Sequence, residues 1–169
     1  GGVNATGLAS ENNPFIVKYS DAGVPQWAAT VTDGTTGGIF LALAMDASGN
    51  LFAAGKISGT GTAYFSTKAA AAGTNPKSNA LLVKYDSTGT AVWARSSQYS
   101  GTASYYEGTQ FDSIALDNAG GIYIAGCLED SGTYTFADGI SAAGGECVLI
   151  KYGTDGAAKW VREPGGCGA

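Results

Sequence analysis

Two short phrases recur in this chain with fixed internal spacing, and this repetition constrains the fold more than any other feature. In the first phrase a lysine is followed nine residues later by a tryptophan, in three copies: Lys18 and Trp27, Lys84 and Trp93, and Lys151 and Trp160. The second phrase occurs twice, over 41–55 and 112–126, and in both copies an aspartate precedes a glycine by nine residues. Copies that keep their spacing while their connections vary in length indicate rigid units joined by surface loops.

Each phrase is predicted to form a β-hairpin. Apolar, β-branched and aromatic runs flank turn sequences such as "DASGN", "DSTG" and "GTDG", in which Gly supplies positive φ and Asp bonds the turn backbone. We name the strands of the second phrase A and B, and those of the first phrase C and D. The chain then runs C–D, A–B–C–D, A–B–C–D. Related segments that start at Ser58 and Ser131, between B and C, are expected to add short strands.

This order predicts an all-β chain of four-stranded antiparallel β-propeller-type repeats, about two and a half blades in all. We expect a single repeat domain, with a half repeat over 1–40 and full repeats over 41–107 and 108–169. A closed propeller needs at least about four blades. The array is therefore expected to be part of a longer chain, an assembly completed by other chains, or a non-propeller stack of the same hairpins. An open array would leave unpaired sheet edges, which favour head-to-tail association.

The repeat resembles the bacterial seven-bladed β-propeller (SBBP) repeat family. The first full copy carries the family pattern at Asp46, Gly49, Asn50, Gly55, 58–60, Lys84, Tyr85, Asp86, Gly89 and Trp93. The second copy carries it at Asp117, Gly120, Gly126, 131–133, Lys151, Tyr152, Gly156 and Trp160, with Gly121 in place of the Asn and Asp155 inside the turn. The resemblance implies a secreted or surface protein of bacteria, in long multi-repeat chains, without an assigned activity.

Charge and composition disfavour several classes of partner and chemistry. The net charge is −5, with nine basic and fourteen acidic side chains, which argues against nucleic acid and anionic membrane surfaces. No apolar run approaches the roughly 18 residues of a membrane span, so we expect no membrane insertion. Histidine is absent, which removes the commonest general base and metal ligand. We expect no catalysis and no cofactor.

The recurring tryptophans and lysines are predicted to pack between blades, because each occupies one strand position in every repeat. The alternative for the tryptophans is stacking on sugar rings, assisted by Tyr19, Tyr85 and Tyr152. Their pattern is also similar to the docking motif of quinoprotein propellers. The lysines could instead line a channel for an anion, pair with Asp46 or Asp117, or extend to the surface.

The insertion "SSQYSGTASYYEGTQF" differs most between copies and is the candidate recognition loop, through Tyr99, Tyr105 and Tyr106. A solvated loop is the alternative. The aspartate-containing turns lack the D-x-D-x-D-G spacing of a calcium loop, and Glu129 with Asp130 is a lone acidic pair, so turn formation is the favoured role. Glycosidase chemistry needs two facing carboxylates, and nothing singles out a pair.

Three cysteines, Cys127, Cys147 and Cys167, are spaced by 20 residues, too far apart for a CxxC metal site. Cys127 ends strand B and Cys147 begins strand C, so antiparallel pairing brings them together. We predict a Cys127–Cys147 disulfide with a stabilisation of about 3 kcal/mol, in keeping with an oxidising exterior. Cys167 is then free or linked to a partner chain.

The sequence thus predicts a non-catalytic, secreted or cell-surface bacterial protein with a structural or adhesive role. Its expected partners are further copies of itself, in an extracellular filament, or neighbouring repeats of a longer chain. A carbohydrate-binding propeller lectin is the alternative, with a glycan as partner. A quinoprotein-like or other propeller enzyme is the third hypothesis.

Overall fold

Two four-stranded antiparallel sheets and one two-stranded hairpin form the body of the molecule in a computed structural model that describes residues 2–8, 12–103 and 109–164. The first blade has the order β4 (Gly38–Met45), β5 (Leu51–Ser58), β8 (Ser78–Tyr85) and β9 (Ala91–Ser96). The second blade has the order β11 (Gln110–Leu116), β12 (Ile122–Leu128), β15 (Glu146–Tyr152) and β16 (Ala158–Arg162). The half-blade is β1 (Ile16–Tyr19) paired with β2 (Pro25–Ala29).

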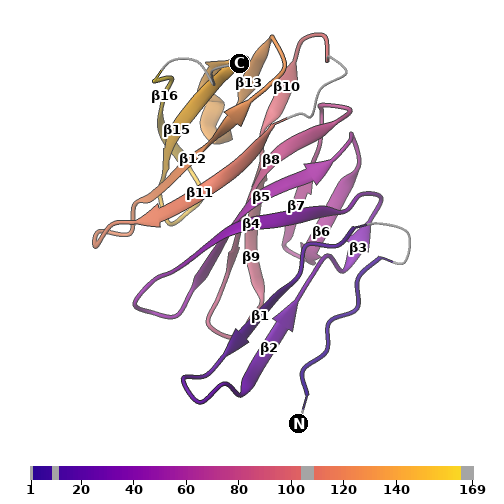
Figure 1. Ribbon diagram of the computed structural model, residues 1–169, viewed down its shortest axis with the longest axis vertical. Coiled ribbons are helices and arrows are strands. Elements are labelled where there is room, and N and C mark those ends of the chain that lie inside the picture. Colours follow the sequence, from indigo (N-terminus) through magenta and orange to yellow (C-terminus); the bar gives the residue numbers. More distant parts are fainter. Residues whose placement is uncertain (1, 9–11, 104–108, 165–169) are drawn as a thin grey trace.

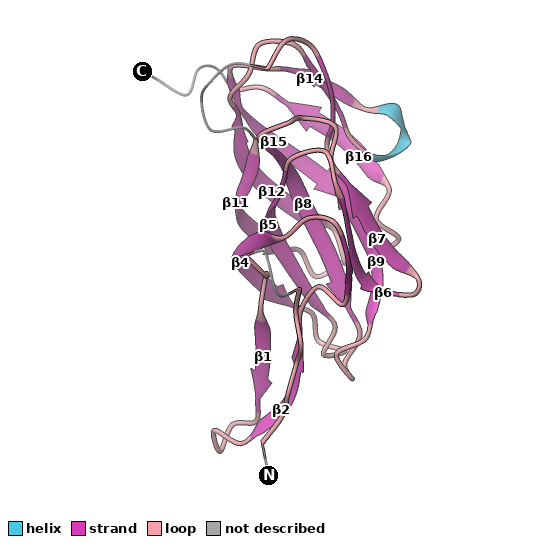
Figure 2. Cartoon of the chain, turned by 90° about the vertical axis from the view of Figure 1, so that its right-hand side faces the viewer, coloured by secondary structure: helices cyan, strands magenta, loops and turns pink. Residues whose placement is uncertain are grey.

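The predicted fold class is confirmed. The strands follow the predicted A–B–C–D order in each blade, and within the described residues the sheets do not close into a barrel. The three units follow one another along the long axis of the molecule, with the half-blade at one end and the second blade at the other (Figure 1). In the perpendicular view β1 and β2 again extend beyond the rest of the molecule (Figure 2).

Two small three-stranded sheets join consecutive units. One contains β3 (Asp33–Gly34), β6 (Thr62–Ser66) and β7 (Ala69–Ala72), and the other contains β10 (Gln98–Ser100), β13 (Thr133–Thr135) and β14 (Ser141–Ala143). A 3₁₀ turn, Ala137–Gly139, lies between β13 and β14. β6–β7 and β13–β14 are the short strands expected between B and C. β3 and β10 follow strand D of the preceding unit, so their pairing ties each unit to the next.

The two middle strands of the first blade are buried on both faces. Leu51, Ala53 and Val83 belong to a core that also takes in Ile16 of the half-blade. Alternate residues of the same strands, such as Phe52 and Leu82, belong to a core shared with the second blade. Because side chains alternate along a strand, the middle strands β5 and β8 are buried on both sides. This explains why their sequences are almost continuously apolar.

Candidate functional site

One contact recurs at each junction between units and centres on the tryptophan of strand D. The indole Nε1–H of Trp27, in the half-blade, donates to the carbonyl oxygen of Ser87 in the C–D turn of the first blade at 3.1 Å. Trp93 makes the same bond, also at 3.1 Å, to the carbonyl oxygen of Thr154 in the C–D turn of the second blade. The tryptophan of one unit is therefore held by the turn of the next.

A glycine lies under each of these two rings. A Cβ atom on Gly89 would lie 2.6 Å from the Trp27 ring, and one on Gly156 would lie 3.0 Å from the Trp93 ring. Both glycines also have positive φ angles, +88° and +77°, which side chains disfavour. The turn glycine thus has two roles, since it forms the turn and admits the ring. The sequence signal for the second role is the constant five-residue spacing from the lysine to this glycine.

Trp160 is the third tryptophan of the series and lies on the outer face of the second blade. Its ring meets Tyr123 edge-on, with centroids 6.0 Å apart, as Trp93 packs against Phe52 at 6.2 Å. Trp93 is nearly buried, whereas Trp160 is partly exposed. Among the residues that the structure describes, the Nε1–H of Trp160 has no acceptor.

The recurring lysines lie directly opposite the tryptophans across each C–D hairpin, in three pairs: Lys18 with Trp27, Lys84 with Trp93, and Lys151 with Trp160. Their charged ends differ. Lys84 Nζ donates to the carbonyl oxygen of Thr154 at 3.3 Å, the same oxygen that accepts from Trp93. Lys18 makes no hydrogen bond or ion pair within the described part of the chain. The ammonium groups of Lys18 and Lys84 therefore have different partners, although both lysines occupy the same position of the repeat.

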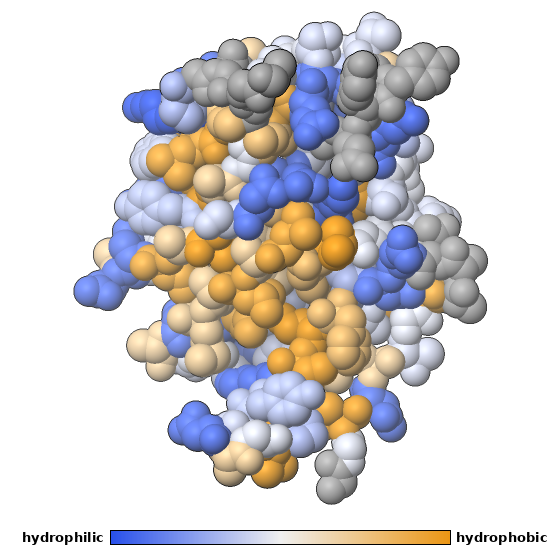
Figure 3. Space-filling view, in the orientation of Figure 1, coloured by the Kyte–Doolittle hydropathy of each residue, from blue (hydrophilic) through white to orange (hydrophobic). Residues whose placement is uncertain are grey.

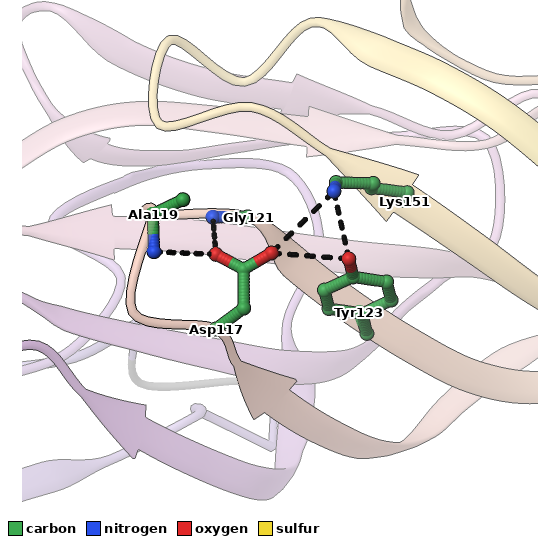
Figure 4. A network of polar contacts seen from close by, with 5 residues as sticks. All are labelled: Asp117, Ala119, Gly121, Tyr123 and Lys151. Atoms are coloured by element: carbon green, nitrogen blue, oxygen red, sulfur yellow. Dashed lines mark hydrogen bonds and ion pairs between the residues drawn. The ribbon is translucent and has the colours of Figure 1, made fainter.

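Lys151 turns back into its own blade and joins a network around Asp117 (Figure 4). Its Nζ donates to Tyr123 Oη at 2.7 Å and lies 3.4 Å from Asp117 Oδ2. Tyr123 Oη in turn donates to Asp117 Oδ2 at 3.0 Å. The structure therefore places Lys151 beside Asp117, one of the two aspartates considered as a partner.

Two sequence differences account for this network. Tyr123, whose hydroxyl takes part in it, stands where the first blade has Phe52, and the other difference is at Asn50. In the first blade, Asn50 Nδ2 donates to Asp46 Oδ2 at 2.8 Å and occupies that oxygen. The second blade has Gly121 in place of the asparagine. A Cβ atom at Gly121 would lie 2.5 Å from Asp117 Oδ2 and 2.8 Å from Lys151 Cε. Because Gly121 has no side chain, Asp117 Oδ2 is free of an asparagine and accepts from Lys151 and Tyr123 instead.

Hydrogen bonds shift the ionisation of this group. The backbone amide of Gly121, which donates to Asp117 Oδ1, is the main cause that lowers the pKa of Asp117, and Tyr123 and the amide of Ala119 add to it. The bond to Tyr123 is the main cause that raises the pKa of Lys151, with a further contribution from Asp117. Both groups are thus held in their charged forms.

The other turn aspartates also bind their own backbone. Asp86 Oδ1 accepts from the amides of Thr88 and Thr90, and Asp155 Oδ1 accepts from the amide of Ala157. Over the described residues, no three Cys, Asp or Glu side chains come together as a metal ion would require. A cleft of about 390 Å³ lies between the A–B turns of the two blades, with Asp46 and Asp117 in its wall.

The predicted Cys127–Cys147 disulfide is not formed in this structure. The two cysteines do lie opposite each other in β12 and β15, as the predicted antiparallel pairing requires. Their sulfur atoms are 3.8 Å apart, almost twice the ~2.05 Å of an S–S bond. Cys147 is disulfide-bonded, but not to Cys127, so strand register places the two residues side by side without a bond between them. Cys167 lies outside the described residues.

Of the three tyrosines in the candidate recognition loop, only Tyr99 falls within the described residues; Tyr105 and Tyr106 lie outside them. Tyr99 belongs to strand β10, and its hydroxyl donates to the carbonyl oxygen of Ser131 at 2.7 Å. Its ring packs against Tyr134 with centroids 4.9 Å apart. This tyrosine thus helps to join the first blade to the small sheet of the second blade.

Comparison with known proteins finds a distant relative, and no family model matches the chain. Over 124 residues, 69% of this chain, the sequence is 29% identical to the uncharacterized WD repeat-containing protein L264 of Acanthamoeba polyphaga mimivirus. The aligned part spans 8% of that protein. WD repeats are four-stranded propeller blades, the unit seen here. This chain is built of propeller-type repeats. No helix in the described ranges is long and apolar enough to cross a membrane.

Proposed function

We propose that this chain is a non-catalytic structural protein of the bacterial exterior, secreted or held at the cell surface, which associates with further blades of its own kind to form a filament. The resemblance to SBBP repeats supports the location. The apolar face of β4, which is uncovered in a single chain, supports the association.

The uncovered face of β4 carries this proposal. Leu43 and Met45 are 53% and 57% exposed, and Ile39 and Leu41 on the same strand are also exposed. Apolar side chains gather in the middle of the molecular face on which β4 lies (Figure 3). The equivalent strand of the second blade, β11, packs against β4 and β5, and its Ile114 and Leu116 join the core. Contiguous exposed apolar surface of this kind marks an interaction site.

The half-blade explains why this face is open. It consists of strands C and D, and β1 has β2 as its one neighbour among the described strands. In the second blade the equivalent strand β15 pairs on its other side with β12. Strands A and B of another blade would extend the β1 edge and pack over Leu43 and Met45.

A double variant tests the association. Leu43→Gln with Met45→Gln makes this face polar without touching the core. We expect unchanged thermal unfolding and an association at least about tenfold weaker, measured by light scattering over a range of concentrations. Val92→Gln, at an exposed apolar position on β9, is the matched control and should associate like the wild type. Equal association of the double variant and the wild type would contradict the role of β4.

The location has its own test. Antibodies against the chain should detect it in the culture medium or on intact cells of the source bacterium. Detection in the cytosolic fraction alone would contradict the exterior location.

A carbohydrate-binding lectin is the second candidate, favoured by the cleft beside Asp46 and Asp117 and by the partly exposed ring of Trp160. The two proposals separate on a glycan array. Binding that is lost in Trp160→Ala or Asp117→Asn would establish the lectin.

A further inference from the structure

The contact between a tryptophan and the next C–D turn recurs along the chain, and each end of the described chain carries one half of it: the turn 20–23 at one end and Trp160 at the other. Trp27 docks on the turn of the first blade and Trp93 on the turn of the second. We infer that a second copy of this chain docks head to tail, with Trp160 of one copy on the C–D turn of the half-blade, 20–23, of the next. This inference rests on the proposed self-association and adds a second contact, between the two ends of the chain, to the contact at the β4 face.

The half-blade turn has the conformation of the two turns that hold a tryptophan. The amide of Gly23 donates to the carbonyl oxygen of Ser20 at 2.8 Å, and the amide of Ser20 donates to that of Val24 at 2.9 Å. The turn of the first blade makes the same two bonds, from Gly89 to Asp86 and from Asp86 to Thr90. Asp21 stands where Ser87 and Thr154 stand, so its carbonyl oxygen is the expected acceptor.

At the half-blade turn, the space that a tryptophan ring fills at the other two turns is empty of described residues. A Cβ atom on Gly23 would meet nothing within 4 Å, whereas Gly89 and Gly156 lie directly under indole rings. Tyr19 is 57% exposed, although its counterparts Tyr85 and Tyr152 are 0% and 1% exposed. Tyr85 stacks on Trp27 with centroids 6.2 Å apart. The half-blade thus presents a turn and a tyrosine without their tryptophan.

The other end presents Trp160, which meets no such turn in the described part of the chain. The guanidinium of Arg162 lies 5.7 Å from the Trp160 ring, as that of Arg95 lies 5.5 Å from the Trp93 ring. Arg162 Nη1 donates to the carbonyl oxygen of Val161, as Arg95 Nη1 does to that of Ala94. Arg95 also donates through Nε to the next turn, at the Gly156 carbonyl oxygen. Arg162 is therefore already placed to bind the Gly23 carbonyl oxygen in the same way.

Donor and acceptor lie at opposite ends of the molecule, on the second blade and on the half-blade (Figure 1). A contact between two different surfaces repeats from copy to copy, and it forms an open filament unless the rotation closes a ring. Two copies meeting through the same surface would instead stop at a dimer.

The test exploits the open space at Gly23. Gly23→Asn adds a side chain that tolerates positive φ and clashes with nothing in one copy, but it blocks the ring of another copy. Gly139→Asn is the matched control, because Gly139 also has a φ of +73° and open space around it. By sedimentation velocity, we expect Gly23→Asn to raise the dissociation constant at least about tenfold and Gly139→Asn to leave it unchanged.

A mixing experiment tests the head-to-tail order. Trp160→Ala keeps the turn and Gly23→Asn keeps the tryptophan, so each alone should associate at least about tenfold more weakly than the wild type, whereas an equimolar mixture should form pairs of one copy of each at wild-type strength. Circular dichroism verifies that both variants are folded. Self-association of Gly23→Asn at wild-type strength, or a mixture that stays monomeric, overturns the inference while leaving self-association intact. A wild type that is monomeric at every concentration overturns self-association itself.

Discussion

The interior of this repeat array differs from its two ends although all are built from the same phrases. Tyr85 is buried between the half-blade and the first blade, whereas Tyr19, at the same position of the repeat, lies in solvent. Trp93 is held by the following turn, whereas no turn among the described residues holds Trp160. The residue types are identical, so the neighbouring unit decides whether a position is core or surface. Each end therefore presents half of an interface that the interior contains complete.

The largest effect on stability is expected from Tyr85→Ala, compared with Tyr19→Ala at the same position of the repeat. Tyr85→Ala removes a ring that packs on Trp27 and Phe40, and it should lower the free energy of unfolding by about 3–5 kcal/mol. Tyr19→Ala should change it by less than about 0.5 kcal/mol. Urea denaturation of the dilute protein measures both. Equal losses at the two positions would show that the half-blade turn is covered within one chain.

Alanine substitutions at two turn glycines distinguish the cost of backbone strain from the cost of crowding a tryptophan ring. Gly23→Ala should cost about 1–2 kcal/mol, because alanine disfavours positive φ. Gly156→Ala has the same strain and also pushes against the Trp93 ring, so overpacking should add about 1–3 kcal/mol. The same denaturation experiment gives both values. If Gly156→Ala lowered the free energy of unfolding no more than Gly23→Ala, the Trp93 ring would move aside without an energetic cost.

A smaller effect is expected from the carboxylate of Asp117. Its pKa is lowered in the folded chain, so its stabilising contribution is present above the unfolded pKa of about 3.9 and is lost as the pH falls through the folded pKa. The stability of the wild type should therefore exceed that of Asp117→Asn at neutral pH, and the difference should shrink below about pH 4. Thermal unfolding of both proteins from pH 7 to pH 3 measures this. A difference that is constant with pH would contradict the ionic role.

Much of the fold follows from local sequence. The apolar runs and the Asp- and Gly-containing turns predict the hairpins, because strand alternation and turn conformation are properties of a few adjacent residues. The alternation of the two phrases predicts the A–B–C–D order in each blade. The pairing of β3 and β10 was not foreseen, because these strands are two and three residues long and pair across long connections.

The site was less predictable than the fold. Repetition predicts that the lysines share a strand position, but the partner of Lys151 depends on Gly121 in a different strand pair. The Cys127–Cys147 disulfide was predicted from strand register, which gives neighbours but does not decide which cysteine bonds to which; Cys147 is disulfide-bonded, but not to Cys127. The role of the turn glycine as a seat for the ring had a signal in its constant spacing, but turn formation alone already explained that glycine.

Sedimentation velocity of the unmodified chain over a wide range of concentration tests the proposed completion of the array by other copies most directly. We predict a sedimentation coefficient that rises with concentration, as 16.9 kDa chains join head to tail. A single 16.9 kDa species at every concentration would contradict the proposal, since the two open ends would then be stable in water without a partner.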